Sequence, residues 1–126
     1  MKIASTIARL LLGLVFVVFG LNFWLKFAPI PPFPEGSQAA AFMGAMYVTG
    51  FLTVVKVLEV VGGLLLLTGR FTNLGLAILG PIVFNIALFH FLIVQGAYEM
   101  SVFIGVLSLV ALAGRKNFIG ALFAAK

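Results

Sequence analysis

Two charged side chains lie in the middle of an apolar stretch of this sequence. Lys56 and Glu59 are three residues apart, among valines and leucines. On a helix this spacing puts both side chains on one face. The pair offers a carboxylate that can exchange a proton and an ammonium group that can donate hydrogen bonds. Two interpretations are open: a polar ligand site, or an internal pair that locks the helices together.

The composition of the chain places this pair in a membrane. Of the 126 residues, 63% are hydrophobic and 9% are charged, whereas soluble domains carry about 25% charged residues. The length allows one integral membrane domain, residues 1–126, because each span needs about 20 apolar residues. The chain has no cysteine, which excludes disulfides and thiolate metal sites. Its net charge of +5 is scattered along the sequence, so we interpret it as a topology signal and predict no nucleic-acid partner.

Proline and glycine divide the chain into its predicted helices. Residues 28–38 include four prolines and a glycine and cannot be helical. Residues 39–67 as one helix would measure ~43 Å, more than the ~30 Å hydrocarbon core. We therefore predict a break at Thr49-Gly50. The predicted fold class is all-α, a four-transmembrane-helix bundle with a short interfacial helix at 39–48 and with spans at 6–27, 51–68, 73–94 and 97–114.

The basic residues predict how the spans are oriented. If the N-terminus is cytoplasmic, six basic residues fall at the inner ends of the spans: Lys2, Arg9, Arg70, Arg115, Lys116 and Lys126. Only Lys26 then lies near the outer ends, beside Glu35 and Glu99. This asymmetry predicts that both termini are cytoplasmic. For the tail, 115–126, two alternatives are open: an amphipathic helix on the membrane, or a continuation of the fourth helix.

The predicted spans place several polar side chains at similar depths in the outer half of the bilayer. At 1.5 Å per residue, Glu59 and Asn85 lie ~12–13 Å below the outer ends of their spans. Lys56 and Asn22 lie ~8 Å deep and His90 ~6 Å deep. An unpaired carboxylate there would cost roughly 2.5–3.5 kcal/mol, so Glu59 should be paired, hydrogen-bonded or protonated. We expect Lys56 or Asn85 as its partner. The predicted ligand-binding or buried polar cluster is Glu59, Lys56, Asn85, Asn22, His90 and Lys26.

The remaining residues give little sign of catalysis. His90 is the one histidine of the chain and has no second strong ligand near it. We therefore predict no metal site and no catalytic residue. Trp24, Tyr47 and Tyr98 fall near the predicted outer interface, where aromatic side chains form a belt.

Three motifs carry a resemblance to a known family. They are Arg9-Leu10-Leu11-Leu12-Gly13, Phe19-Gly20, and the stretch LEVVGGLLLLTGR at 58–70. Together they resemble the DoxX family of small four-helix membrane proteins, over roughly the first three helices up to about Gln95. Many relatives have a basic residue soon after the glycine that corresponds to Gly20. In this sequence Asn22-Phe23-Trp24 intervenes and the nearest basic residue is Lys26.

The resemblance implies a location in a bacterial or archaeal inner membrane. Some relatives resemble the membrane subunit of a thiosulfate:quinone oxidoreductase, and others occur in membrane-associated oxidative-stress complexes. Distant eukaryotic relatives act as cargo receptors or assembly chaperones. Fold alone does not choose among these roles.

We expect an accessory subunit of a larger membrane assembly, without catalysis by this chain alone and without a covalently bound cofactor. Its partners would be other membrane subunits or further copies of itself. A lipid or quinone would bind in the polar cluster. The alternatives are a quinone-reducing membrane subunit of an oxidoreductase and a small proton-coupled carrier.

Reporter fusions test the predicted topology. A reporter after Lys126 should report the cytoplasm, and one inserted beside Glu35 should report the opposite side, because the Lys/Arg bias orients the spans. Fusions at both positions that report the same side would contradict the prediction.

Overall fold

All regular structure in the described part of the chain is helical. The computed structural model describes residues 2–27, 32–96 and 98–123. The elements in chain order are α1 (Lys2–Leu25), α2 (Gln38–Thr49), α3 (Phe51–Thr68), α4 (Thr72–Leu88), the π-helix η1 (Phe89–Val94), α5 (Tyr98–Ala113) and α6 (Lys116–Leu122). Helices α1, α3, α4 with η1, and α5 form the four-helix bundle, and the predicted fold class is confirmed.

The bundle helices have the length and composition of membrane spans. Helix α1 has 24 residues, α3 has 18, and α4 together with η1 has 23, each long and apolar enough to cross a membrane. Helix α5 is a shorter apolar helix of 16 residues. The outward faces carry large apolar side chains, for example Val54, Leu74 and Leu109, as the lipid-facing surface of a membrane protein does.

Two glycines set the ends of α3. Gly50 has φ of 83° and belongs to both α2 and α3 as their shared cap, so the predicted break between these helices is present. A residue with a Cβ would be strained in this left-handed conformation. Gly69 has φ of 74° and closes the other end, where its N–H donates to the carbonyl of Leu65 at 3.2 Å.

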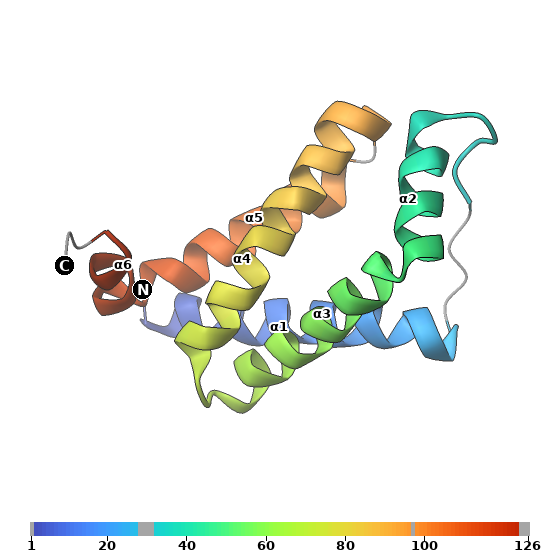
Figure 1. Cartoon of the computed structure of the whole chain (residues 1–126). Coiled ribbons are helices and arrows are strands. Elements are labelled where there is room, and N and C mark those ends of the chain that lie inside the picture. Colours follow the sequence, from blue (N-terminus) through green and yellow to red (C-terminus); the bar gives the residue numbers. More distant parts are fainter. Residues whose placement is uncertain (1, 28–31, 97, 124–126) are drawn as a thin grey trace.

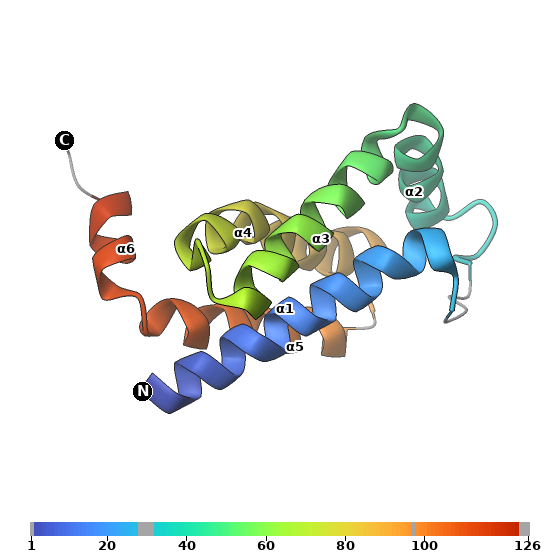
Figure 2. The same ribbon diagram turned by 90° about the horizontal axis from the view of Figure 1, so that it is seen from below.

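Helices α1 and α3 run side by side in both views (Figures 1 and 2) and their backbones touch. A Cβ added to Gly63 would lie 2.8 Å from the Gly13 carbonyl oxygen, and one added to Gly13 would lie 2.8 Å from that of Gly63. Lipid tails supply no hydrophobic drive for helix association, so small residues that allow close packing hold membrane helices together. The neighbouring Gly62 faces the other way, and its Cβ would lie 2.7 Å from Leu79 of α4.

The apolar core lies toward one end of the bundle. The first turn of α1 and helix α6 lie at this end (Figure 1), which we call the termini end. The fully buried large side chains are Phe16, Leu12, Leu66 and Leu79. Toward the opposite end three buried side chains are polar, Asn22, Glu59 and Ser101, and they lie beside the apolar Ala39, Leu52 and Ile104. Helices α4 and α5 lean away from α1 and α3 toward this opposite end, where α2 stands (Figure 1).

The tail forms a separate short helix. Arg115 leaves the helical region with φ of −121° and ψ of 55°, and α6 then runs over 7 residues. Both views show α6 turned out of line with α5 (Figures 1 and 2). Of the two alternatives for the tail, a continuous fourth helix is therefore wrong for the described residues, because the chain bends at Arg115.

The glycine contact between α1 and α3 predicts a stability effect. Gly63→Ala should lower the free energy of unfolding by about 1–3 kcal/mol, because its methyl group meets backbone that cannot move aside. The measurement is thermal unfolding in detergent, followed by circular dichroism.

Gly105→Ala is the matched control, since a Cβ at Gly105 would meet nothing within 4 Å. It should be neutral or stabilising by up to about 1 kcal/mol through helix propensity. Equal melting temperatures for the two variants would contradict the close α1–α3 contact.

Candidate functional site

The two charged residues of α3 form an ion pair inside the bundle. Lys56 Nζ lies 3.4 Å from Glu59 Oε1 and donates a hydrogen bond to it. Glu59 is 5% exposed, while the Lys56 side chain retains 21% exposure. The prediction that Glu59 faces inward with Lys56 in reach agrees with this geometry. The carboxylate is thus the covered member of the pair, and the ammonium group is the accessible one.

Helix α1 packs directly against the turn of α3 that carries the pair. A Cβ at Gly20 would lie 2.7 Å from Val60 Cγ2 and 3.4 Å from the carbonyl oxygen of Lys56. The glycine therefore lets the α1 backbone lie against the Lys56–Val60 turn. Asn22, half a turn further along α1, is 4% exposed. The structure thus places Asn22 and the ion pair at the same end of the α1–α3 contact, and both Asn22 and Glu59 are buried there.

Asn85 does not join this cluster. It is exposed, and its amide Nδ2 donates to the carbonyl of Pro81 in its own helix at 2.9 Å. Two causes keep it apart from Glu59. The buried face of α4 runs through Leu79 and Ile82 and does not include position 85, and α4 leans away from α3 toward this end (Figure 1). The alternative of Asn85 as the hydrogen-bond partner of Glu59 is therefore corrected in favour of Lys56.

His90 lies in the π-helical segment η1. Its Nδ1 is 2.9 Å from the carbonyl oxygen of Ile86. Because a carbonyl oxygen only accepts, Nδ1 carries the proton of this bond. The His90 carbonyl in turn accepts from the N–H groups of Gln95 and Gly96, at 2.8 and 3.3 Å. Short π-helical segments recur at functional sites, and periodicity of the sequence gave no sign of this one.

Lys26 lies outside the buried cluster. It follows the end of α1, is exposed, and has a left-handed backbone with φ of 52°. Its N–H donates to the carbonyl of Asn22 at 2.9 Å, which ends the helix. Among the described residues no group of three or more His, Cys, Asp or Glu side chains is placed to hold a metal ion.

Aromatic contacts link α2 to both sides of this end of the bundle. The rings of Phe42 and Phe33 lie 5.3 and 5.5 Å from that of Phe89 in η1. Tyr47 lies 6.1 Å from Phe23 of α1. Helix α2 therefore connects the end of α1 with η1, on the side of the bundle that holds Glu59.

One buried hydroxyl at this end was missed by the sequence reasoning. Ser101, in the first turns of α5, is 4% exposed, and its Oγ has no hydrogen-bond partner within the described residues. A buried polar atom without a partner costs about 1–3 kcal/mol, so a water or ligand atom is expected to bind it. A lone serine in an apolar run carries no sequence signal for such a role.

These observations define a helical integral membrane protein with an ion pair buried in its second bundle helix. The family model of DoxX matches residues 4–92, which is most of the chain. The protein belongs to the DoxX family. The match runs from α1 into η1 and includes every residue of the predicted polar cluster, whereas α5 and α6 lie outside it. No curated protein and no solved structure matches the chain.

A double-mutant cycle tests the ion pair. Glu59→Leu and Lys56→Met should each lower the free energy of unfolding by about 1–3 kcal/mol, because each leaves a polar partner unsatisfied. The double variant should cost less than the sum, since removing both charges leaves no uncompensated one. Unfolding in a detergent titration supplies the measurement.

Glu59→Gln is the conservative variant and should unfold close to wild type. Glu99→Gln, an exposed position at the start of α5, controls for the change of charge. Strict additivity of the two single effects, within about 0.5 kcal/mol, would mean that the residues do not interact.

Proposed function

We propose that this DoxX-family protein is an accessory subunit of a larger membrane assembly and that it binds the headgroup of a quinone or lipid at Lys56 and Glu59. The observation that carries the proposal is the ion pair, with its covered carboxylate and accessible ammonium group. An ammonium group has three N–H donors, and the bond with Glu59 uses one. The others can reach a quinone carbonyl or a lipid phosphate oxygen. Glu59 fixes the lysine in place for this contact.

The surroundings of the pair suit an amphiphilic ligand. The aromatic rings of Phe33, Phe42 and Phe89 gather at the same end of the bundle, and flat rings stack favourably on aromatic side chains. The unpartnered hydroxyl of Ser101 adds a second hydrogen-bonding group at that end. A polar head with an apolar body matches such a combination of groups.

The accessory role rests on what the sequence contains. It has no cysteine and one histidine, so electrons for a redox reaction would have to come from a partner subunit.

Large lateral surfaces of the bundle remain available for other membrane subunits or for further copies of the chain. In an apolar stretch of 18 residues within Thr72–Val94, only 11% of the residues are buried. The proposed location is a bacterial or archaeal inner membrane, with both termini in the cytoplasm on the positive-inside argument.

A quinone-reducing subunit is the second candidate, and the position of Glu59 favours it. Reduction of a quinone consumes two protons and two electrons. The electrons would come from a partner subunit, and a buried carboxyl group that has first taken up a proton is placed to pass it to a bound headgroup. In that case Glu59→Gln would fold normally and bind the ligand but abolish turnover of the assembly. In the accessory role the same variant would leave turnover unchanged.

Ligand retention tests the proposal. Protein purified in mild detergent should carry quinone or phospholipid, measured by solvent extraction and chromatography per mole of chain. Lys56→Met should weaken ligand binding about 10- to 100-fold, which is the effect of losing one hydrogen bond from a charged donor. The amount of ligand retained per mole of chain should fall accordingly. The chromatogram itself tells quinone from lipid.

Lys26→Met is the matched control, a lysine lost from an exposed position at the same end of the bundle. It should retain the ligand like wild type. Equal retention in Lys56→Met and Lys26→Met would overturn the binding site. Native electrophoresis of the same preparation tests the accessory role, which predicts migration well above the 13.4 kDa of a single chain, together with other subunits.

A further inference from the structure

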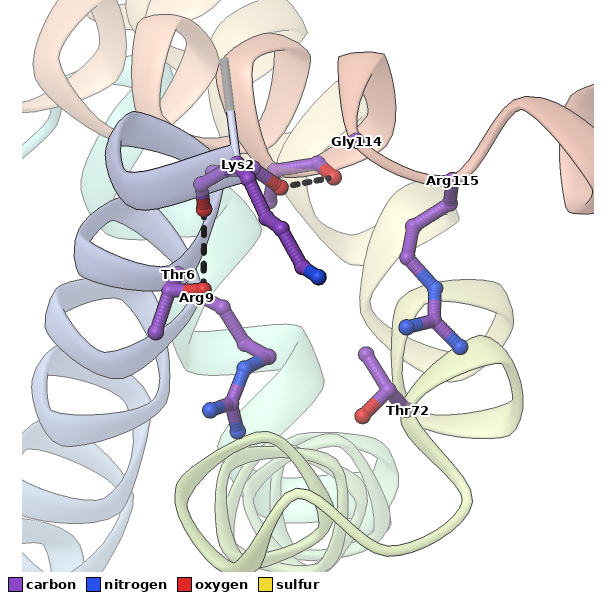
Figure 3. A pocket seen from close by; sticks show the side chains of 8 residues that line it. Lys2, Thr6, Arg9, Thr72, Gly114 and Arg115 are labelled. Carbon is purple, nitrogen blue, oxygen red and sulfur yellow. Dashed lines mark hydrogen bonds between the residues drawn. The ribbon is translucent and has the colours of Figure 1, made fainter.

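A second polar site lies at the termini end, away from the ion pair. A cavity of about 150 Å³ opens between the first turns of α1, the turn from α3 to α4, and the end of α5. Its walls carry three basic side chains and three hydroxyls: Lys2, Arg9, Arg115, Ser5, Thr6 and Thr72. Figure 3 shows Lys2, Arg9 and Arg115 directed into one shared space, with Thr72 beside them.

The fold holds two of the three cations in place through neutral partners. Arg9 donates from Nη1 to the carbonyl oxygen of Leu66, near the end of α3. Arg115 donates from Nε to Asn73 Oδ1 at 2.8 Å. A guanidinium has five N–H donors, so each arginine keeps several for a ligand. Both arginines are half-buried, which reduces screening by solvent.

No carboxylate balances this charge among the described residues that line the cavity. The chain contains three acidic residues. Glu59 is paired with Lys56, and Glu35 and Glu99 precede α2 and begin α5, both toward the opposite end. Cations that share a partly buried space disfavour one another. A bound anion would remove this repulsion.

We propose that this cavity binds a phosphate group. Arginine and lysine are the side chains that recognise phosphate oxygens. The Thr72 hydroxyl can add a donor, whereas those of Ser5 and Thr6 already donate to the carbonyls of Ala111 and Lys2. The volume is below the roughly 300 Å³ at which pockets for drug-sized ligands begin. It is therefore of a size to take an anionic headgroup.

The depth of the cavity favours a phospholipid as the source of the phosphate. Helix α1 begins at Lys2 and measures ~36 Å at 1.5 Å per residue, so its first turns reach beyond a ~30 Å hydrocarbon core to the headgroups. A second cavity of about 360 Å³ shares Lys2 and Gly114 with the first and adds Lys116 and Asn117. It provides room for the polar part of a headgroup beyond its phosphate. Basic pockets between membrane helices bind anionic lipid headgroups in this way.

The α1–α5 contact beside the cavity requires a glycine. Ser5 Oγ donates to the carbonyl of Ala111 at 3.0 Å, and a Cβ at Gly114 would lie 2.1 Å from that hydroxyl oxygen. This close approach brings the start of α1 to the end of α5. It thereby places Lys2 opposite Arg115 across the cavity (Figure 3).

Binding of two phosphate probes to the full chain in a zwitterionic detergent tests the proposal. The probes are short-chain phosphatidylglycerol and inorganic phosphate, with short-chain phosphatidylcholine and sodium chloride of equal ionic strength as references. The readout is the shift of the unfolding midpoint with probe concentration.

Arg115→Gln should weaken binding about 10- to 100-fold, the loss expected for one charged hydrogen-bonding partner. Lys2→Gln is a second variant that should weaken binding without affecting folding, because Lys2 is exposed. Arg115→Gln, by contrast, also removes the bond to Asn73.

Arg70→Gln is the matched control, an exposed arginine in the turn from α3 to α4 that does not line the cavity. It should bind like wild type. Stabilisation by phosphatidylglycerol alone identifies a lipid, and an equal effect of inorganic phosphate, with the same dependence on Arg115, identifies a soluble source. No shift with either probe, or equal losses in Arg115→Gln, Lys2→Gln and Arg70→Gln, would overturn the proposal.

Discussion

The close approach of α1 and α3 is the contact on which the rest of this bundle depends. Gly13 and Gly63 bring the two backbones together where lipid offers no drive for association. From that line of contact, Gly20 rests on the turn that carries Lys56 and Glu59, and Arg9 reaches the last turn of α3. One interhelical contact thus positions a polar group on each side of it: the cation cavity at the termini end and the ion pair toward the opposite end.

The two halves of the bundle bury different kinds of side chain. In the half near the termini, Leu12, Phe16, Leu66 and Leu79 fill the interior with aliphatic and aromatic groups. In the other half, α4 and α5 lean outward, and the buried polar side chains Asn22, Glu59 and Ser101 lie among apolar ones, with α2 alongside. The half near the termini thus holds the fully buried large side chains, and the other half holds the buried carboxylate of Glu59 with the more accessible ammonium group of Lys56.

The sequence predicted features that depend on local chemistry and missed those that depend on long-range geometry. The turn at Gly50 and the ion pair at Lys56 and Glu59 arise from residues close together in the chain, so spacing and helix length revealed them. The orientation of Asn85 depends on the tilt of α4, which no local pattern encodes. The cavity joins segments far apart in the sequence, and the bond from Ser5 to Ala111 beside it links residues 106 apart. The π-helical turn at His90 leaves the apolar pattern unchanged, so it gave no signal.

Helix α2 is attached to the rest of the bundle by few contacts, and this affects how it moves. It joins α3 through the single residue Gly50, and Ala39 is the one residue along its length that is buried. The contact of its Phe42 ring with Phe89 contributes about 0.5–1.5 kcal/mol beyond the buried area. A helix held by a few kcal/mol visits displaced positions at roughly the 0.1–10% level, on the microsecond-to-millisecond scale of collective motion. The ligand proposed to bind at Lys56 would then exchange through displacement of α2, while the glycine contact between α1 and α3 stays closed.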